Sequence, residues 1–115
     1  MQIQIKRAYA EVLATDGKRI LVDRLWPRGI KKKDAKIDLW PKDITPSTEL
    51  RKWYAHDPEH WEEFQQRYRT ELQEQAALLQ QIKEIAKQEK ISLITAAKSE
   101  KYNHVIVLKQ VLEES

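Results

Sequence analysis

The chain has 115 residues, and its content of 41% hydrophobic and 34% charged residues is that of a folded protein rather than a disordered one. It contains no cysteine, which excludes disulfides, thiol catalysis and sites in which cysteine binds zinc or an iron–sulfur cluster. A chain of this length typically forms one hydrophobic core, so we expect a single domain over residues 1–115.

The net charge of +3 is unevenly distributed along the chain. Residues 1–53 hold 13 Lys and Arg against 7 Asp and Glu, whereas residues 54–115 hold 8 against 11. The basic half includes the run Lys31-Lys32-Lys33. Such a cluster can attract nucleic acid, but lysine runs are more often only solvated, so nucleic acid is a secondary hypothesis.

No apolar run approaches the roughly 18 residues of a membrane span, and the first residues lack the apolar segment of a signal peptide. We therefore expect a cytoplasmic protein without a membrane partner.

Two short strands are expected in the first quarter of the chain. Ile3 and Ile5 alternate with polar residues, which is typical of a half-buried strand that continues to Lys6 or Arg7. The turn at Asp16-Gly17 precedes the apolar, β-branched run 20–22, which predicts a central strand. Further along, a short helix is expected near residues 34–37.

Two capping signals predict consecutive helices in the middle of the chain. Thr45-Pro46-Ser47 offers a cap at Thr45 or Ser47, and Asp57-Pro58 repeats the pattern of a capping residue followed by proline. After the second signal, apolar residues recur at steps of three and four until about Gln88, which indicates one long helix with a kink near Gln75. These residues are Trp61, Phe64, Tyr68, Leu72, Ala76, Leu79, Ile82 and Ala86.

The last quarter predicts one more strand and one more helix. Residues 91–95 form another apolar, β-branched run, and the apolar positions between Val105 and Leu112 have helical spacing, with Ser99 as a candidate cap. Apolar strands separated by long helices favour an α/β fold with a small parallel central sheet flanked by helices in three layers. A four-helix bundle is less favoured because the runs at 20–22 and 91–95 are too short and too β-branched.

The strand expected at 20–23 runs directly into the charged end of the segment Leu21 to Gly29, LVDRLWPRG. If this strand and the strand at 91–95 are parallel neighbours, their carboxyl ends share one edge of the sheet, where open α/β folds bind ligands. The expected ligand-binding residues at that edge are Arg24, Trp26, Arg28, Lys98, Asn103 and His104, and the candidates for a catalytic role are His104 and Asp23.

The chemistry of this set favours an anionic ligand. The planar guanidinium group of an arginine can hold a phosphate or a carboxylate with two hydrogen bonds, and Lys98 adds a compact positive charge. His104 can move a proton near neutral pH, and Asp23 can orient it. The alternative is a structural role, in which Asp23 pairs with an arginine, Trp26 packs in a corner and His104 is a satisfied polar residue.

Metals and cofactors are not expected. His56 and His60 have the spacing of a helical metal pair, but Pro58 at the first helical position places His56 before the helix, so we predict no metal site. With two glycines and no GxGxxG, P-loop, HExxH or GxSxG motif, the chain does not predict a cofactor or a known hydrolase site.

Three stretches together resemble the YeaO-like branch of a large bacterial family of unknown function. They read DGKRILVDRLWPRGI, then PSTELRKWYAHDPEHWEEFQQRYRTEL, then LITAAKSEKYNHVIVL, and they cover most of the chain. The resemblance implies a small cytosolic α/β domain with a parallel sheet and no established activity. Members of the wider family often carry cysteines at positions that here read Thr95-Ala96-Ala97 and Asn103-His104, so thiol chemistry is not implied for this chain.

Three hypotheses for function follow. The first is a crevice that binds a small phosphate-like or nucleotide-like anion, with enzymatic turnover left open. The second is a nucleic-acid-binding module that uses the basic half, and the third is an interaction module whose aromatic helix face completes an oligomer. Because the long helix has one apolar face, which the sheet would cover, we expect mainly a monomer, with a dimer as the alternative.

Overall fold

The computed structural model of the chain describes residues 1–114 and is built on a three-stranded parallel sheet. The strands β1 (Ile3–Arg7), β2 (Lys18–Leu21) and β3 (Ile91–Thr95) lie in the order β1-β3-β2. Leu93 of β3 is in register with Ile5 on one side and Ile20 on the other. Every residue of β3 is buried, including the polar Ser92 and Thr95, as is typical of a central parallel strand. The three expected strands and their parallel pairing are confirmed, although β2 begins and ends slightly earlier than the apolar run that predicted it.

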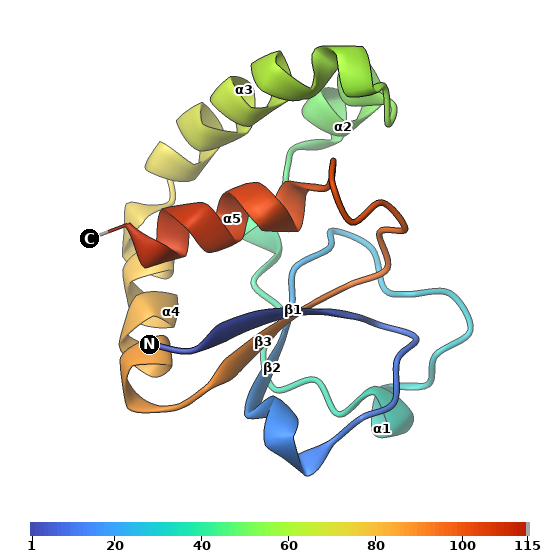
Figure 1. Cartoon of the computed structure of the whole chain (residues 1–115), viewed down its shortest axis with the longest axis vertical. Helices are drawn as coiled ribbons and strands as arrows, with labels where there is room; N and C mark the ends of the chain where they lie inside the picture. Colours follow the sequence, from blue (N-terminus) through green and yellow to red (C-terminus); the bar gives the residue numbers. More distant parts are fainter. Residues whose placement is uncertain (115) are drawn as a thin grey trace.

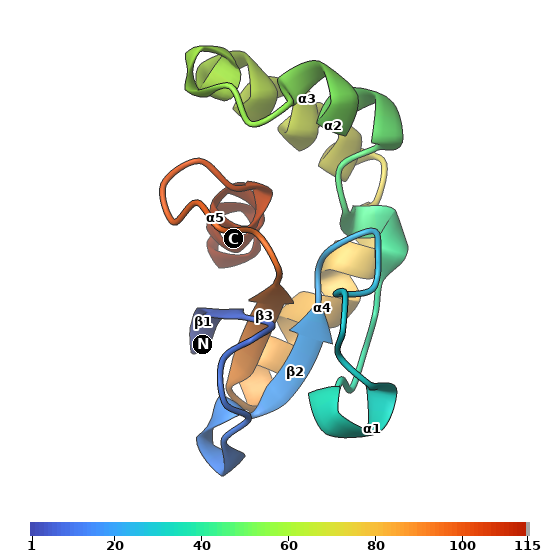
Figure 2. The ribbon, with the colours of Figure 1, turned by 90° about the vertical axis from the view of Figure 1, so that its right-hand side faces the viewer.

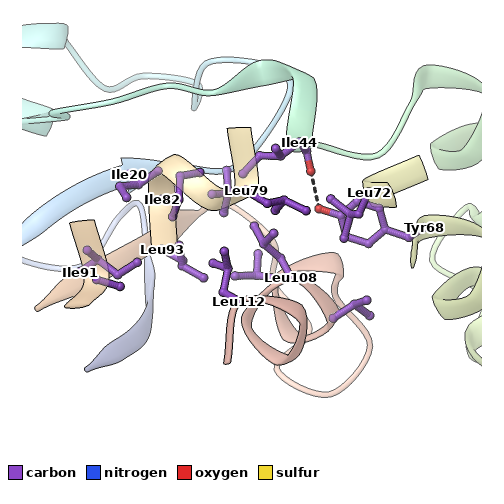
Figure 3. Packing of buried hydrophobic residues seen from close by; sticks show 14 of the residues in the cluster. Ile20, Ile44, Tyr68, Leu72, Leu79, Ile82, Ile91, Leu93, Leu108 and Leu112 are labelled. Atoms are coloured by element: carbon purple, nitrogen blue, oxygen red, sulfur yellow. Dashed lines mark hydrogen bonds between the residues drawn. The ribbon is translucent and has the colours of Figure 1, made fainter. Parts of the chain in front are cut away.

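One face of the sheet carries the main hydrophobic core. The helices α4 (Ala76–Gln88) and α5 (His104–Glu113) pack on this face, and Figure 3 shows their side chains meeting those of the sheet. Ile20, Ile91 and Leu93 supply the sheet side of the contact. On the helix side, the stripe recognised in the sequence supplies Leu79, Ile82 and Ala86.

The opposite face of the sheet is covered by a thinner layer. There Leu21 and Ile94 pack under Trp26 and Trp40, whose rings meet edge to face with centroids 5.5 Å apart. The only helix of this layer among residues 1–114 with α geometry is the single-turn α1 (Lys32–Ala35), which begins slightly earlier than expected. The sheet is therefore covered on both faces, but the two covering layers are unequal.

Beyond the carboxyl ends of the strands lies an arm of helices, visible at the top of Figure 2. It consists of α2 (Thr48–Tyr54), the short 3-10 turn Pro58–His60 and α3 (Trp61–Gln73). Ser47 caps α2 by accepting from the Leu50 N–H, and Asp57 caps the next turn, as the sequence predicts. In Figure 2 the arrowheads of β2 and β3 point toward this arm.

The arm is joined to the core by a buried tyrosine. The Tyr68 hydroxyl donates to the Ile44 carbonyl over 2.5 Å, drawn as the dashed line in Figure 3. Ile44 ends the 3-10 turn Lys42–Ile44, which follows the thin layer in the chain. Because both groups are inaccessible to solvent, this bond fixes α3 relative to the segment that follows the second layer.

Two sequence-based expectations about helices were wrong in detail. The change of direction expected near Gln75 is confirmed, but it is a break at Glu74 and Gln75 between two helices rather than a kink in one, and in Figure 1 α3 and α4 run in different directions. The reason is that α3 packs against α2 and α5, whereas α4 faces the sheet. The apolar stripe of a single straight helix could not face both of these surfaces. The cap of α5 is Asn103, whose side chain accepts from two backbone N–H groups, and Ser99 lies outside the helix.

No helix within residues 1–114 is long and apolar enough to cross a membrane.

Candidate functional site

A pocket of about 420 Å³ lies at the carboxyl ends of the strands, where the sheet edge meets the helical arm. The loops that follow all three strands reach it. Tyr9 comes from the loop after β1, and residues 23–28 come from the loop after β2. The segment after β3 contributes Ala96, Ala97, Ser99, Tyr102, Asn103 and His104. The arm adds Arg51, Tyr54 and His56. In Figure 1 the loops after β2 and β3 both lie on the side of the sheet that faces α2.

Asp23 joins two of these loops at the base of the pocket. One carboxylate oxygen accepts from the Thr95 hydroxyl, and the other accepts from the Ala96 N–H, each over 2.7 Å. Both donors lie where β3 ends, so the carboxylate of one strand's loop binds the end of the neighbouring strand. The expected meeting of the loops after β2 and β3 is therefore confirmed.

His104, the first residue of α5, completes the contacts of Asp23. Its Nε2 lies 2.7 Å from the Val22 carbonyl oxygen and 3.3 Å from the Asp23 carboxylate. Since both partners are acceptors, Nε2 must carry a hydrogen. The ring also meets Tyr68 edge to face with centroids 6.2 Å apart. His104 is thus held in one orientation by the residues that follow β2 and by α3.

The pKa of Asp23 is lowered from its ordinary value of 3.8 by the balance of two effects. Burial alone would raise it, because a charged carboxylate loses solvent. The hydrogen bond and charge of His104 outweigh that effect, together with the Ala96 N–H and the Thr95 hydroxyl. Asp23 is therefore ionised at neutral pH, and its negative charge is already matched by donors of the protein.

Arg24 lies at the pocket, but much of its guanidinium is already used. Its Nε donates to the Pro46 carbonyl and its Nη2 to the Thr45 carbonyl, over 3.2 and 3.3 Å. These bonds hold the segment that leads into α2. Arg24 thus contributes charge to the pocket while it fixes the position of the arm.

Arg28 and Arg51 also line the pocket, and within residues 1–114 neither side chain has an ion-pair partner or a hydrogen bond to another side chain. Both residues are exposed. Their guanidinium groups are therefore available to a ligand, and Arg51 had no signal in the sequence beyond its place on a helix.

Three of the other expected ligand-binding residues have different outcomes. Trp26 lines the pocket, and its indole N–H donates to the Ile30 carbonyl over 2.6 Å. Asn103 also lines it, but its side chain caps α5 and donates to the Ser99 carbonyl. Lys98 is exposed and is absent from the pocket wall. Its neighbours Ala97 and Ser99 line the pocket instead.

Several pocket residues were missed because their positions depend on the helical arm. Tyr54 and Tyr102 are linked by a hydrogen bond from the Tyr54 hydroxyl to the Tyr102 carbonyl, 2.8 Å. His56 reaches the pocket from a left-handed backbone conformation, φ 58°, that follows Ala55 at φ 45°. Consecutive left-handed residues other than glycine are uncommon, and periodicity gives no signal for them.

The two histidines considered as a metal pair are separated in the structure. His56 faces the pocket, whereas His60 stacks on Trp53 with ring centroids 4.6 Å apart. Within residues 1–114 no group of three His, Asp or Glu side chains is placed to hold a metal ion.

Comparisons with known proteins agree with the resemblance seen in the sequence. Residues 2–115 match the model of the family described as "Inactive DUF488-N3 subclade". The uncharacterised protein YeaO of Escherichia coli K12 is 45% identical over 108 residues, 94% of each chain. An uncharacterised protein of Mycobacterium tuberculosis H37Rv is 40% identical over 111 residues, 96% of this chain and 93% of the relative. No solved structure matches the chain significantly.

Proposed function

Because the chain belongs to the inactive DUF488-N3 subclade, we propose that it is a binding protein whose pocket holds a small anionic molecule. The description of the subclade as inactive supports binding without turnover. The pocket agrees with this, since the hydroxyl of Thr95 is bound to Asp23 and that of Ser99 accepts from the Tyr102 N–H. Neither hydroxyl is paired with His104 as a nucleophile would be with its base.

The observation that carries the proposal is an imbalance of charge at the pocket. Arg24, Arg28 and Arg51 line it, whereas its acidic residue, Asp23, is already bound by protein donors. An anion between the arginines would reduce their mutual repulsion and form charge-assisted hydrogen bonds. The volume of about 420 Å³ is within the range of roughly 300–1,000 Å³ typical of small-molecule sites.

The test is thermal unfolding in the presence of inorganic phosphate or sulfate. Binding to the folded state raises the melting temperature by mass action. We expect this rise in the wild type and a much smaller one in Arg28→Ala and Arg51→Ala. Lys98→Ala is the matched control, since it removes one positive charge from a residue outside the pocket wall and should respond like the wild type. An equal response of all four proteins would contradict the proposal.

We also propose that the protein is mainly a cytoplasmic monomer. The apolar stripe of α4 supports the monomer, since Leu79, Ile82 and Ala86 are covered by the protein's own core. Sedimentation at low micromolar concentration tests this, and a stable dimer would contradict it.

A further inference from the structure

The rim of the pocket combines exposed apolar surface with its positive charge. Tyr9, Leu25 and Tyr102 line the pocket and keep 53%, 66% and 38% of their surface exposed. Large apolar side chains that surround a pocket are a common sign of a binding site. A phosphate ion alone would use the arginines and leave these side chains in water.

The two tyrosine rings are held in place from different loops. The Tyr9 hydroxyl donates to the Arg28 carbonyl over 3.0 Å, which joins the loop after β1 to the loop after β2. The Tyr102 ring meets Trp61 edge to face with centroids 5.7 Å apart, and its carbonyl accepts from Tyr54. Rings fixed in this way lose little conformational entropy when a ligand packs against them.

We propose that the ligand is a nucleoside monophosphate, whose base stacks on the exposed tyrosines and whose phosphate binds Arg28 and Arg51; this rests on the proposed function. Stacking on aromatic side chains is how proteins hold nucleobases without reading their edges. Arginine supplies the matching phosphate contact. The pocket is large enough for a single small molecule, and the lysines of α1 lie outside it, so one nucleotide rather than a strand fits the observations.

The experiment measures the affinity of the full chain for AMP, ribose 5-phosphate and inorganic phosphate by calorimetry. AMP and ribose 5-phosphate carry the same phosphate and sugar, so the ratio of their dissociation constants isolates the base. We expect AMP to bind about tenfold more tightly, at the lower end of the range for stacking one base.

Variants of Tyr9 and Tyr102 test whether their rings cause the preference for AMP over ribose 5-phosphate. Tyr102→Leu and Tyr9→Leu each remove a ring but keep apolar bulk, and we expect both to reduce the ratio of AMP to ribose 5-phosphate affinity. Tyr102→Phe keeps the ring and should keep the ratio. Circular dichroism and the melting temperature without ligand show that each variant is folded.

Each outcome decides between the two proposals. If ribose 5-phosphate and phosphate bind as tightly as AMP, the nucleotide proposal fails while the anion-binding function stands. If none of the three binds, the proposed function itself fails. A ratio that is unchanged in both leucine variants would also overturn the stacking role. Tighter binding of a short single-stranded oligonucleotide than of AMP would replace the mononucleotide with a nucleic acid.

Discussion

Asp16, just before β2, and Asp23, just after it, are two carboxylates that are neutralised in different ways. Asp16 has 1% of its surface exposed and binds the permanent charges of Lys6 and Arg19, at 2.7 and 2.6 Å. Asp23 is bound by a hydroxyl, a backbone N–H and a histidine, and 16% of its side chain is exposed.

The two partner sets determine what each region can do. Asp16, Lys6 and Arg19 form a group that we call the Asp16 cluster. It is closed to solvent, since Arg19 is 3% exposed. Arg19 also donates to the Ala35 carbonyl, which secures α1 to the sheet. Asp23 borders a pocket, and one of its partners, His104, lines the same pocket. The contacts of Asp16 and Arg19 therefore stabilise the packing of α1 on the sheet, whereas those of Asp23 join the loops that border the pocket.

The largest expected effect is the loss of the Asp16 carboxylate. Asp16→Ala leaves the buried Arg19 without its partner, and breaking such a pair typically costs about 3–5 kcal/mol of the free energy of unfolding. Urea denaturation measures the change. Glu11→Gln, which alters an exposed acid, is the control and should leave the midpoint nearly unchanged. A loss below about 1 kcal/mol for Asp16→Ala would show that the cluster is not the closed structural region described.

A smaller loss is expected at Asp23, with a distinctive rescue. Asp23→Ala leaves the Ala96 N–H without its acceptor, which costs on the order of 1–3 kcal/mol. Formate is small enough to take the place of the carboxylate, so it should raise the melting temperature of this variant more than that of the wild type. The same salt should not rescue Asp16→Ala, because that cluster is closed to solvent. Equal rescue of both variants would remove the contrast between the regions.

Acid should reveal the Asp16 cluster directly. Burial raises the pKa of Asp16. The hydrogen bonds from Lys6, the Leu13 N–H and Arg19, together with the charge of Lys6, lower it by more than burial raises it, so the pKa is about 2. A carboxyl whose pKa is lower in the folded state stabilises the protein above its unfolded value of 3.8, and this stability is lost as the pH falls toward 2.

We therefore expect the free energy of unfolding to fall by about 2 kcal/mol from Asp16 as the pH drops from about 5 to 2, with a further decrease from Asp23. Urea denaturation across this range should give a flatter pH profile for Asp16→Asn than for the wild type. Parallel profiles for the two proteins would contradict the low pKa.

The contrast between the regions also shows what the sequence can and cannot predict. The strands, their parallel pairing and the edge that holds the pocket follow from apolar runs and from the geometry of parallel sheets. The roles of Arg24 and Arg51 do not, because they depend on how the arm folds over that edge. The Asp16 cluster was missed because Arg19 lies inside a strand, where periodicity cannot show that a buried carboxylate will neutralise it.

The smallest expected effect comes from a pair with the same chemistry as Asp16 and Arg19 but without burial. Glu63 and Arg67 form an ion pair on α3 with about half of each side chain exposed. Water screens such a pair and ordering its side chains costs entropy, so Glu63→Gln should change the free energy of unfolding by about 0.5 kcal/mol or less. Urea denaturation at low and high salt measures this, and high salt should reduce the difference further. A loss as large as that of Asp16→Ala would mean that burial is not what separates the closed cluster from the surface.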